Sequence, residues 1–94
     1  MPPALARSVP HPYVVRSSDT CGGRARIAGT RIPVWLVVAS VVRDGAAPEE
    51  IVEGHPNVTL AQIYDAISYY YDHRREIDAD LRAQDEAWRR ARRK

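Results

Sequence analysis

The stretch Gly29-Thr30-Arg31-Ile32-Pro33-Val34-Trp35-Leu36-Val37-Val38 switches the chain from extended to helical structure. Pro33 suits a first helical position, where its missing N–H costs nothing. The run continues apolar and largely β-branched through Val42, which fits either a buried strand or a buried helix. Its length and the Asp44-Gly45 stop favour a helix of about 11 residues. An apolar surface on every side predicts a helix buried on several faces or lying in a subunit interface.

Two short extended segments precede this switch. Residues 11–16 are rich in β-branched side chains and follow prolines, so we predict a strand there. Cys21-Gly22-Gly23 is a turn signal, and residues 24–27 are predicted to form the return strand of a hairpin. Alternation along this strand would place the guanidinium groups of Arg24 and Arg26 on one face.

Two shorter helices are predicted after the switch. Ala47-Pro48-Glu49-Glu50 begins a brief one, with acids at the positive end of the helix dipole, and Gly54 and Pro56 end it. Thr59 and Gln62 fit a capping box, so the next helix begins there. One stripe of that helix is apolar and consists of Ile63, Ala66, Ile67 and Tyr70.

The last segment, residues 74–94, is polar and favours a helix. One narrow stripe recurs in it at spacings of four and three, as in a coiled coil: Ile77, Leu81, Gln84, Trp88 and Ala91. Such a helix is too polar to lie inside a core, so we expect it to need a surface to lie against.

At 94 residues the chain is predicted to be one domain of the mainly α class. Residues 1–32 form an N-terminal arm and β-hairpin, 33–73 a homeodomain-like helix-turn-helix core of three helices, and 74–94 a long amphipathic helix that binds a partner. A thin core at this size makes an oligomer or a bound partner a reasonable expectation.

The composition predicts a cytoplasmic protein. No run of 18 apolar residues exists to span a membrane, and the first ten residues contain three prolines instead of the apolar segment of a signal peptide. The single cysteine, Cys21, excludes an intrachain disulfide and suits a reducing compartment.

Charge is distributed in three blocks. Residues 1–43 carry six arginines against Asp19, residues 44–73 carry six acids and no Lys or Arg, and residues 74–94 carry eight bases against five acids. Two basic ends therefore flank an acidic middle.

No catalytic or metal-binding pattern emerges, so we expect neither an enzyme nor a cofactor. His11, His55 and His73 have no ligand spacing such as His-X-X-X-His. Cys21 has no histidine beside it in sequence, and a lone thiol is usually inert. Glu49 and Glu50 are adjacent and point to different sides of a helix.

Residues 22–78 contain several blocks in a characteristic order. These are Gly22-Gly23-Arg24-Ala25-Arg26-Ile27-Ala28-Gly29-Thr30-Arg31-Ile32-Pro33-Val34, Asp44-Gly45, Pro48-Glu49-Glu50-Ile51, His55-Pro56-Asn57-Val58-Thr59 and Tyr69-Tyr70-Tyr71-Asp72. In these blocks the chain resembles a family of short bacterial proteins known as domain of unknown function 433. The resemblance implies a helix-turn-helix core and an antitoxin that binds and inhibits a PIN-like ribonuclease toxin. Where the family often has a capping Ser, this chain has Ala47, which weakens that helix start by up to about 1 kcal/mol.

Operator DNA is a second expected partner, through which the antitoxin would repress its own operon. The helix-turn-helix would place Gln62, Tyr64, Asp65 and Ser68 in a major groove. Because residues 44–73 offer no cation for phosphates, the cations would come from the tail or from Arg24, Arg26, Arg31 and Arg43. In the alternative reading, the helices pack this way for stability alone, the arginines lie on a solvated hairpin face, and Arg31 pairs with an acid of the middle segment.

The terminal helix carries the predicted toxin-binding residues. Ile77, Leu81 and Trp88 would leave an exposed apolar stripe in a monomer, and Trp and Arg are enriched at binding hot spots. Arg89, Arg90, Arg92 or Arg93 would reach the metal-binding carboxylates of the nuclease. Alternatively the stripe packs on a second subunit or frays in solvent. We also expect a homodimer, and the competing function is a protein-binding adaptor or dimerisation module without DNA contact.

Overall fold

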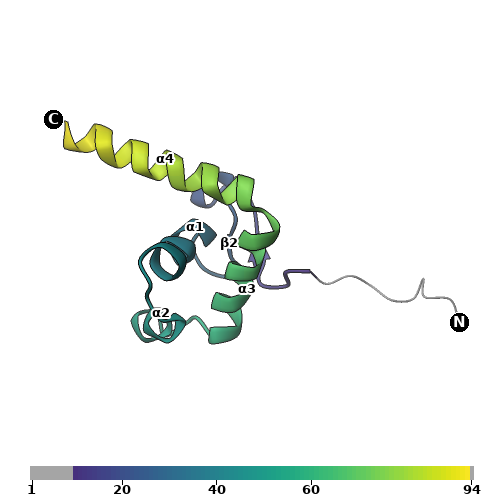
Figure 1. Ribbon diagram of the computed structural model, residues 1–94. Coiled ribbons are helices and arrows are strands. Elements are labelled where there is room, and N and C mark those ends of the chain that lie inside the picture. Colours follow the sequence, from purple (N-terminus) through teal and green to yellow (C-terminus); the bar gives the residue numbers. More distant parts are fainter. Residues whose placement is uncertain (1–9, 94) are drawn as a thin grey trace, which may run out of the picture.

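The computed structural model describes residues 10–93 and shows a small hairpin followed by helices (Figure 1). The elements are β1 (Val14–Val15), η2 (Cys21–Gly23), β2 (Arg26–Ile27), α1 (Val34–Val38), η3 (Ala39–Arg43), α2 (Pro48–Gly54), α3 (Leu60–Asp72) and α4 (Arg74–Arg92). The predicted mainly α class with an N-terminal hairpin is confirmed.

The hairpin is shorter than the sequence predicts. β1 and β2 are antiparallel, with Val14 opposite Ile27 and Val15 opposite Arg26. Two residues on each side pair because turns occupy the rest: the Val14 N–H donates to the His11 carbonyl at 3.2 Å, and η2 takes up the segment before β2. Gly22 and Gly23 adopt φ angles of 62° and 82° there, which glycine tolerates without strain.

The Gly29–Pro33 box builds the loop that leads from the hairpin to α1. Gly29 has a φ of 77°, and the Thr30 hydroxyl donates to the Ile27 carbonyl at 2.8 Å while accepting from the Ile32 N–H at 3.0 Å. At the loop exit the Val34 N–H donates to the Ala25 carbonyl at 2.9 Å. These bonds fix the direction in which α1 leaves the hairpin.

The predicted first helix begins after Pro33 and ends where expected. Its last turn, η3, widens to π-type hydrogen bonding, with the Asp44 N–H donating to the Ala39 carbonyl at 3.0 Å, and Gly45 follows with a φ of 77°. Burial is one-sided. Val34, Val37 and Val38 are buried, whereas Leu36 and Val42 remain 38% and 39% exposed. Within this chain the helix is therefore not buried on several faces, and the alternative, that it lies in a subunit interface, stays a prediction.

The starts of α2 and α3 differ as their sequences predict. At α3 the full capping box forms: the Gln62 N–H donates to the Thr59 hydroxyl at 3.2 Å, and the Thr59 N–H donates to the Gln62 side-chain oxygen at 2.8 Å. At α2 no side chain caps the first turn from Ala47, and Glu50 alone reaches back, accepting from the Ala47 N–H at 3.4 Å.

The core lies between α1, α3 and the first half of α4. From α3 it takes Ile63, Ala66 and Tyr70, as the stripe predicts, with Ile67 half-buried. The hairpin contributes Ala25 and Ile27. Among residues 10–93, no helix combines the length and apolar character needed to cross a membrane.

Candidate partner-binding site

The first half of α4 is part of the protein's own core. Ile77 is fully buried and Leu81 is 7% exposed, and both belong to the same cluster as Ile63 and Val34. The prediction that these two side chains face a partner is therefore wrong. This part of α4 packs on α1 and α3 of the same chain.

Three ion pairs link the same part of α4 to the segments before it in the chain. Arg16 lies 3.4 Å from Glu76, Arg24 lies 3.5 Å from Asp80, and Arg43 lies 3.6 Å from Asp85. Burial raises the pKa of Asp80 above its usual value, and the neighbouring Arg24 opposes that shift only in part. We call residues 74–85, which carry these contacts, the docked half of α4.

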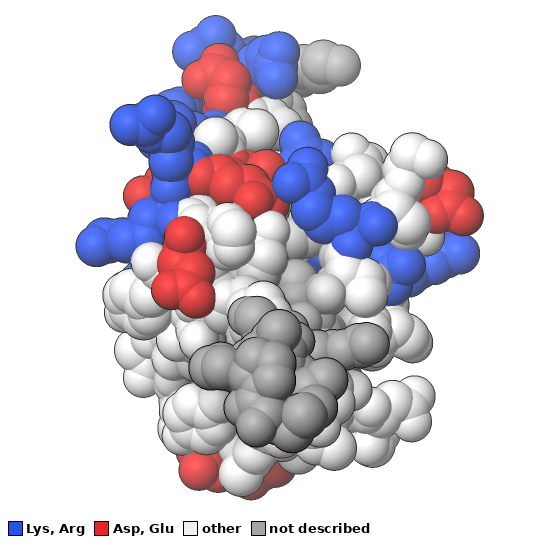
Figure 2. All heavy atoms as spheres, turned by 90° about the vertical axis from the view of Figure 1, so that its right-hand side faces the viewer, with Lys and Arg blue, Asp and Glu red and all other residues white. Residues whose placement is uncertain are grey.

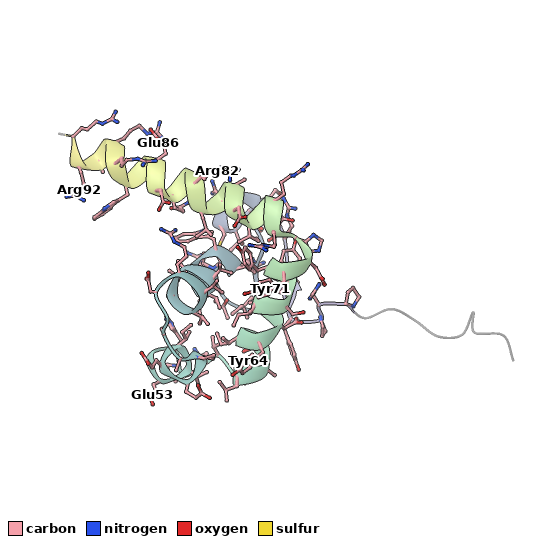
Figure 3. The ribbon with its side chains drawn as sticks, viewed as in Figure 1. Glu53, Tyr64, Tyr71, Arg82, Glu86 and Arg92 are labelled. Carbon is pink, nitrogen blue, oxygen red and sulfur yellow. The ribbon has the colours of Figure 1, made fainter. Side chains whose placement is uncertain are left out.

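Beyond Asp85 the helix continues past the body without covering any core residue (Figure 1). Figure 3 shows Glu86 and Arg92 on this extension, away from α1 and α2. Trp88 lies here and is 65% exposed. It follows Leu81 by seven residues, so it continues the Ile77 and Leu81 stripe into solvent. We call residues 86–93 the free end.

The free end gathers most of the predicted partner-binding residues. Four exposed arginines follow Trp88 there: Arg89, Arg90, Arg92 and Arg93. Glu86 lies 3.3 Å from Arg89 in a pair one turn apart. An exposed indole among guanidinium groups is a composition typical of binding hot spots.

The predicted DNA-binding residues are scattered and mostly engaged within the chain. Arg24 and Arg43 pair with α4, as described above. Arg26 is also engaged within the chain, because its guanidinium donates to the Thr30 carbonyl at 3.0 Å and to the Ser17 hydroxyl at 2.9 Å. Gln62 caps α3.

Arg31 and Tyr64 are exposed, but Arg31 lies in the loop before α1 and Tyr64 lies on α3. Arg31 lines a shallow hollow with residues 54–58, and no carboxylate in residues 10–93 lies within ion-pairing distance of it. Its expected pairing with an acid of the middle segment is therefore not formed.

α3 contributes two acids and no basic residue to the surface. Figure 2 shows basic side chains gathered near α4, with acidic side chains among them and at the lower edge of this face. The acids of α3 itself are engaged: His11 Nε2 lies 2.8 Å from an oxygen of Asp72, and the Tyr13 N–H donates to Asp65 at 2.8 Å. The sequence gives no sign of this His11 network, because its partners lie more than 50 residues away along the chain.

The remaining polar clusters are structural. The Tyr69 hydroxyl donates to the Glu76 carboxylate at 2.9 Å, and burial together with this carboxylate raises the pKa of Tyr69 to about 12.

A groove of about 250 Å³ between α1, η3 and α2 is lined mainly by apolar side chains. Within the described part of the chain, no three His, Cys, Asp or Glu side chains gather to hold a metal.

Comparison with known families gives one match. Residues 14–70 match the family described as "Protein of unknown function (DUF433)", which covers most of the hairpin and the three-helix core. The chain belongs to the DUF433 family. A solved structure of a DUF433 member from Anabaena variabilis is similar, with a TM-score of 0.69 and 35% sequence identity over 73% of this chain and 67% of that one. Comparison of this DUF433 protein with curated proteins found no match.

Proposed function

We propose that this DUF433 protein is the antitoxin of a type II toxin–antitoxin pair and that the free end of α4 binds a PIN-like ribonuclease toxin. The observation that carries the proposal is Trp88, which is 65% exposed on a helix that runs past its own body. A large aromatic side chain gains most from desolvation when a partner covers it, and clustered Trp and Arg dominate many interfaces.

The charge of the free end suits the active site of such a toxin. A nuclease that holds divalent metal through carboxylates presents a concentrated negative charge when the metal is absent. The planar guanidinium groups of Arg89, Arg90, Arg92 and Arg93 pair with carboxylates in bidentate fashion. A guanidinium held there would prevent metal binding and so inhibit the enzyme.

A binding measurement with the protein encoded by the adjacent reading frame tests the proposal. Trp88→Ala should weaken toxin binding by about thirtyfold or more, the typical loss at a hot spot. The matched control is Tyr13→Ala, which removes another exposed aromatic side chain from the hairpin and should leave the affinity unchanged. Equal affinity of wild type and Trp88→Ala would overturn the proposed site.

Truncation gives a second test that spares the core. A chain ending at Asp85 keeps Ile77, Leu81 and all three ion pairs of the docked half. It should fold, with an unchanged unfolding transition, and fail to rescue cells from the toxin on co-expression. Rescue by this truncated chain would show that the toxin is bound through another surface and would overturn the assignment of the free end. Failure of the full chain to rescue would favour the competing function, an adaptor or dimerisation module.

Operator binding remains a separate prediction. The helix-turn-helix arrangement of α2 and α3 supports it, and the internal use of Arg24, Arg26 and Arg43 counts against it. A gel shift with the upstream region at two salt concentrations tests whether the protein binds operator DNA, because phosphate contacts weaken steeply with salt. No shift at low salt would remove the repressor role and leave toxin binding intact.

A further inference from the structure

Two loops that are far apart in sequence meet in a hollow beside α2. Residues 29–32, which lead into α1, and residues 54–58, which join α2 to α3, line a hollow of about 330 Å³. We call it the loop hollow. Its lining includes Arg31, His55 and Asn57 and contains no Asp or Glu. The residues of the loop hollow therefore offer side-chain N–H donors and no negative charge.

Arg31 differs from the other arginines of residues 10–73. The guanidinium groups of the other four are hydrogen-bonded or ion-paired within the chain: Arg16, Arg24, Arg26 and Arg43. Within residues 10–93, by contrast, the Arg31 side chain is exposed and forms no hydrogen bond or ion pair, and the same is true of His55 and Asn57. Each of these three side chains therefore has donors available for a ligand.

Both loops are held in place by contacts that do not use these donors. In the first loop the Thr30 hydroxyl makes two hydrogen bonds to backbone groups, and the Cys21 thiol donates to the Arg31 carbonyl at 3.4 Å. In the second loop the Val58 N–H donates to the His55 carbonyl at 2.9 Å, and the Val58 side chain is buried. The backbone of the loop hollow is therefore ordered before a ligand binds, which lowers the entropic cost of binding.

We propose that the loop hollow binds a phosphate group. A guanidinium forms two parallel hydrogen bonds with an anion, and one such pair engages both oxygens of a carboxylate. A phosphate group has a further oxygen that can accept from His55 or Asn57 as well. At Gly29 and Gly54 an added Cβ would meet no atom within 4 Å, so these two positions leave the loop hollow open to a ligand.

Two sources carry this chemistry, a free phosphorylated small molecule and the backbone of a nucleic acid. The second source is reasonable because residues 54–58 form the turn between α2 and α3, and Arg31 supplies a cation that α2 and α3 themselves lack. The proposal does not depend on toxin binding, which is assigned to the free end of α4.

Nuclear magnetic resonance of the isotope-labelled full chain, titrated with inorganic phosphate at constant ionic strength, tests the loop hollow. Phosphate should cause saturable shifts of the Arg31 and Asn57 signals, and acetate should cause smaller ones. Arg31→Ala should weaken phosphate binding at least about tenfold, because it removes a charged bidentate donor. Arg75→Ala is the matched control, since Arg75 is exposed on α4 and lies outside the loop hollow.

His55→Ala and Asn57→Ala should each weaken phosphate binding by a smaller factor, about threefold or more. No saturable shift with phosphate, or equal affinity for acetate, would overturn the phosphate site. Unchanged affinity in Arg31→Ala, or in both His55→Ala and Asn57→Ala, would overturn its assignment to the loop hollow. Circular dichroism checks that each variant is folded.

A short DNA duplex of arbitrary sequence then identifies the source of the phosphate group. If the source is a nucleic-acid backbone, the duplex should displace inorganic phosphate, and Arg31→Ala should reduce the salt dependence of duplex binding by about one phosphate contact. If the source is a small molecule, inorganic phosphate should stay bound in the presence of the duplex. Either result supports the loop hollow as a phosphate site.

Discussion

The two halves of α4 have the same pattern and opposite environments. The docked half places Ile77 and Leu81 in the core, at 0% and 7% exposure, and forms three ion pairs with the rest of the chain. The free end continues the same stripe, yet its Trp88 is 65% exposed. Helical periodicity therefore says which side of α4 is apolar and leaves open what covers that side.

The boundary between the halves is set by the body on which the helix lies. The last residue of α4 tied to another element is Asp85, through Arg43 at the end of η3. Past this point every residue of α4 is exposed, and Trp88 is 65% exposed. Stability and partner binding should accordingly separate along one helix, and two pairs of substitutions test this.

The largest expected difference concerns the stripe itself. Ile77→Ala should lower the free energy of unfolding by about 2–5 kcal/mol, because it leaves a cavity at a fully buried position. Trp88→Ala should change it by less than about 0.5 kcal/mol, as is usual for an exposed site. Urea denaturation of the chain alone measures both. A large loss for Trp88→Ala would mean that the free end packs on its own protein, and the comparison would fail.

A smaller effect on the free energy of unfolding is expected when an exposed alanine in each half of α4 is replaced by glycine. Ala79 and Ala87 are both exposed, so Ala→Gly changes the helix propensity with little change in packing. Ala79→Gly should lower the global unfolding free energy by about 1 kcal/mol, since the docked half unfolds with the core. Ala87→Gly should leave the unfolding transition in place and speed amide hydrogen exchange at the free end. Equal shifts of the transition would show that α4 unfolds as one unit.

The sequence was sufficient for features that depend on neighbouring residues. The Thr59 and Gln62 capping box correctly placed the start of α3, and Asp44-Gly45 correctly placed the end of the first helix. The apolar stripe of α3 identified its buried side. Each of these signals involves residues within about one or two helical turns of one another, so neighbouring residues alone determine the local structure.

The sequence was insufficient for features that depend on tertiary contacts. Arg24 and Arg43 look like available cations in sequence, but their partners Asp80 and Asp85 are 56 and 42 residues further along the chain. The division of α4 into a docked half and a free end also depends on tertiary contacts, because no residue within α4 marks how far the supporting helices extend beneath it.

The smallest effect distinguishes burial from ion pairing within the docked half. The Asp80 side chain is 17% exposed, and Oδ2 is buried without a hydrogen-bond partner in residues 10–93. Because burial raises the pKa of Asp80 from 3.8, the folded state binds a proton more tightly than the unfolded state. Stability from this group is therefore highest at low pH and falls as the pH rises from about 3.8 through the raised value.

Asp80→Asn removes this titration, so the variant should gain stability relative to wild type as the pH rises through that window, and remain slightly more stable at neutral pH. Urea denaturation at a series of pH values measures the difference. Asp85→Asn is the control, since it breaks an ion pair whose partners are both about half exposed and should change stability by less than about 0.5 kcal/mol. If Asp80→Asn instead loses relative stability as the pH rises, the Arg24 ion pair outweighs the burial of the carboxylate, and the docked half is held by its charges as well as by Ile77 and Leu81.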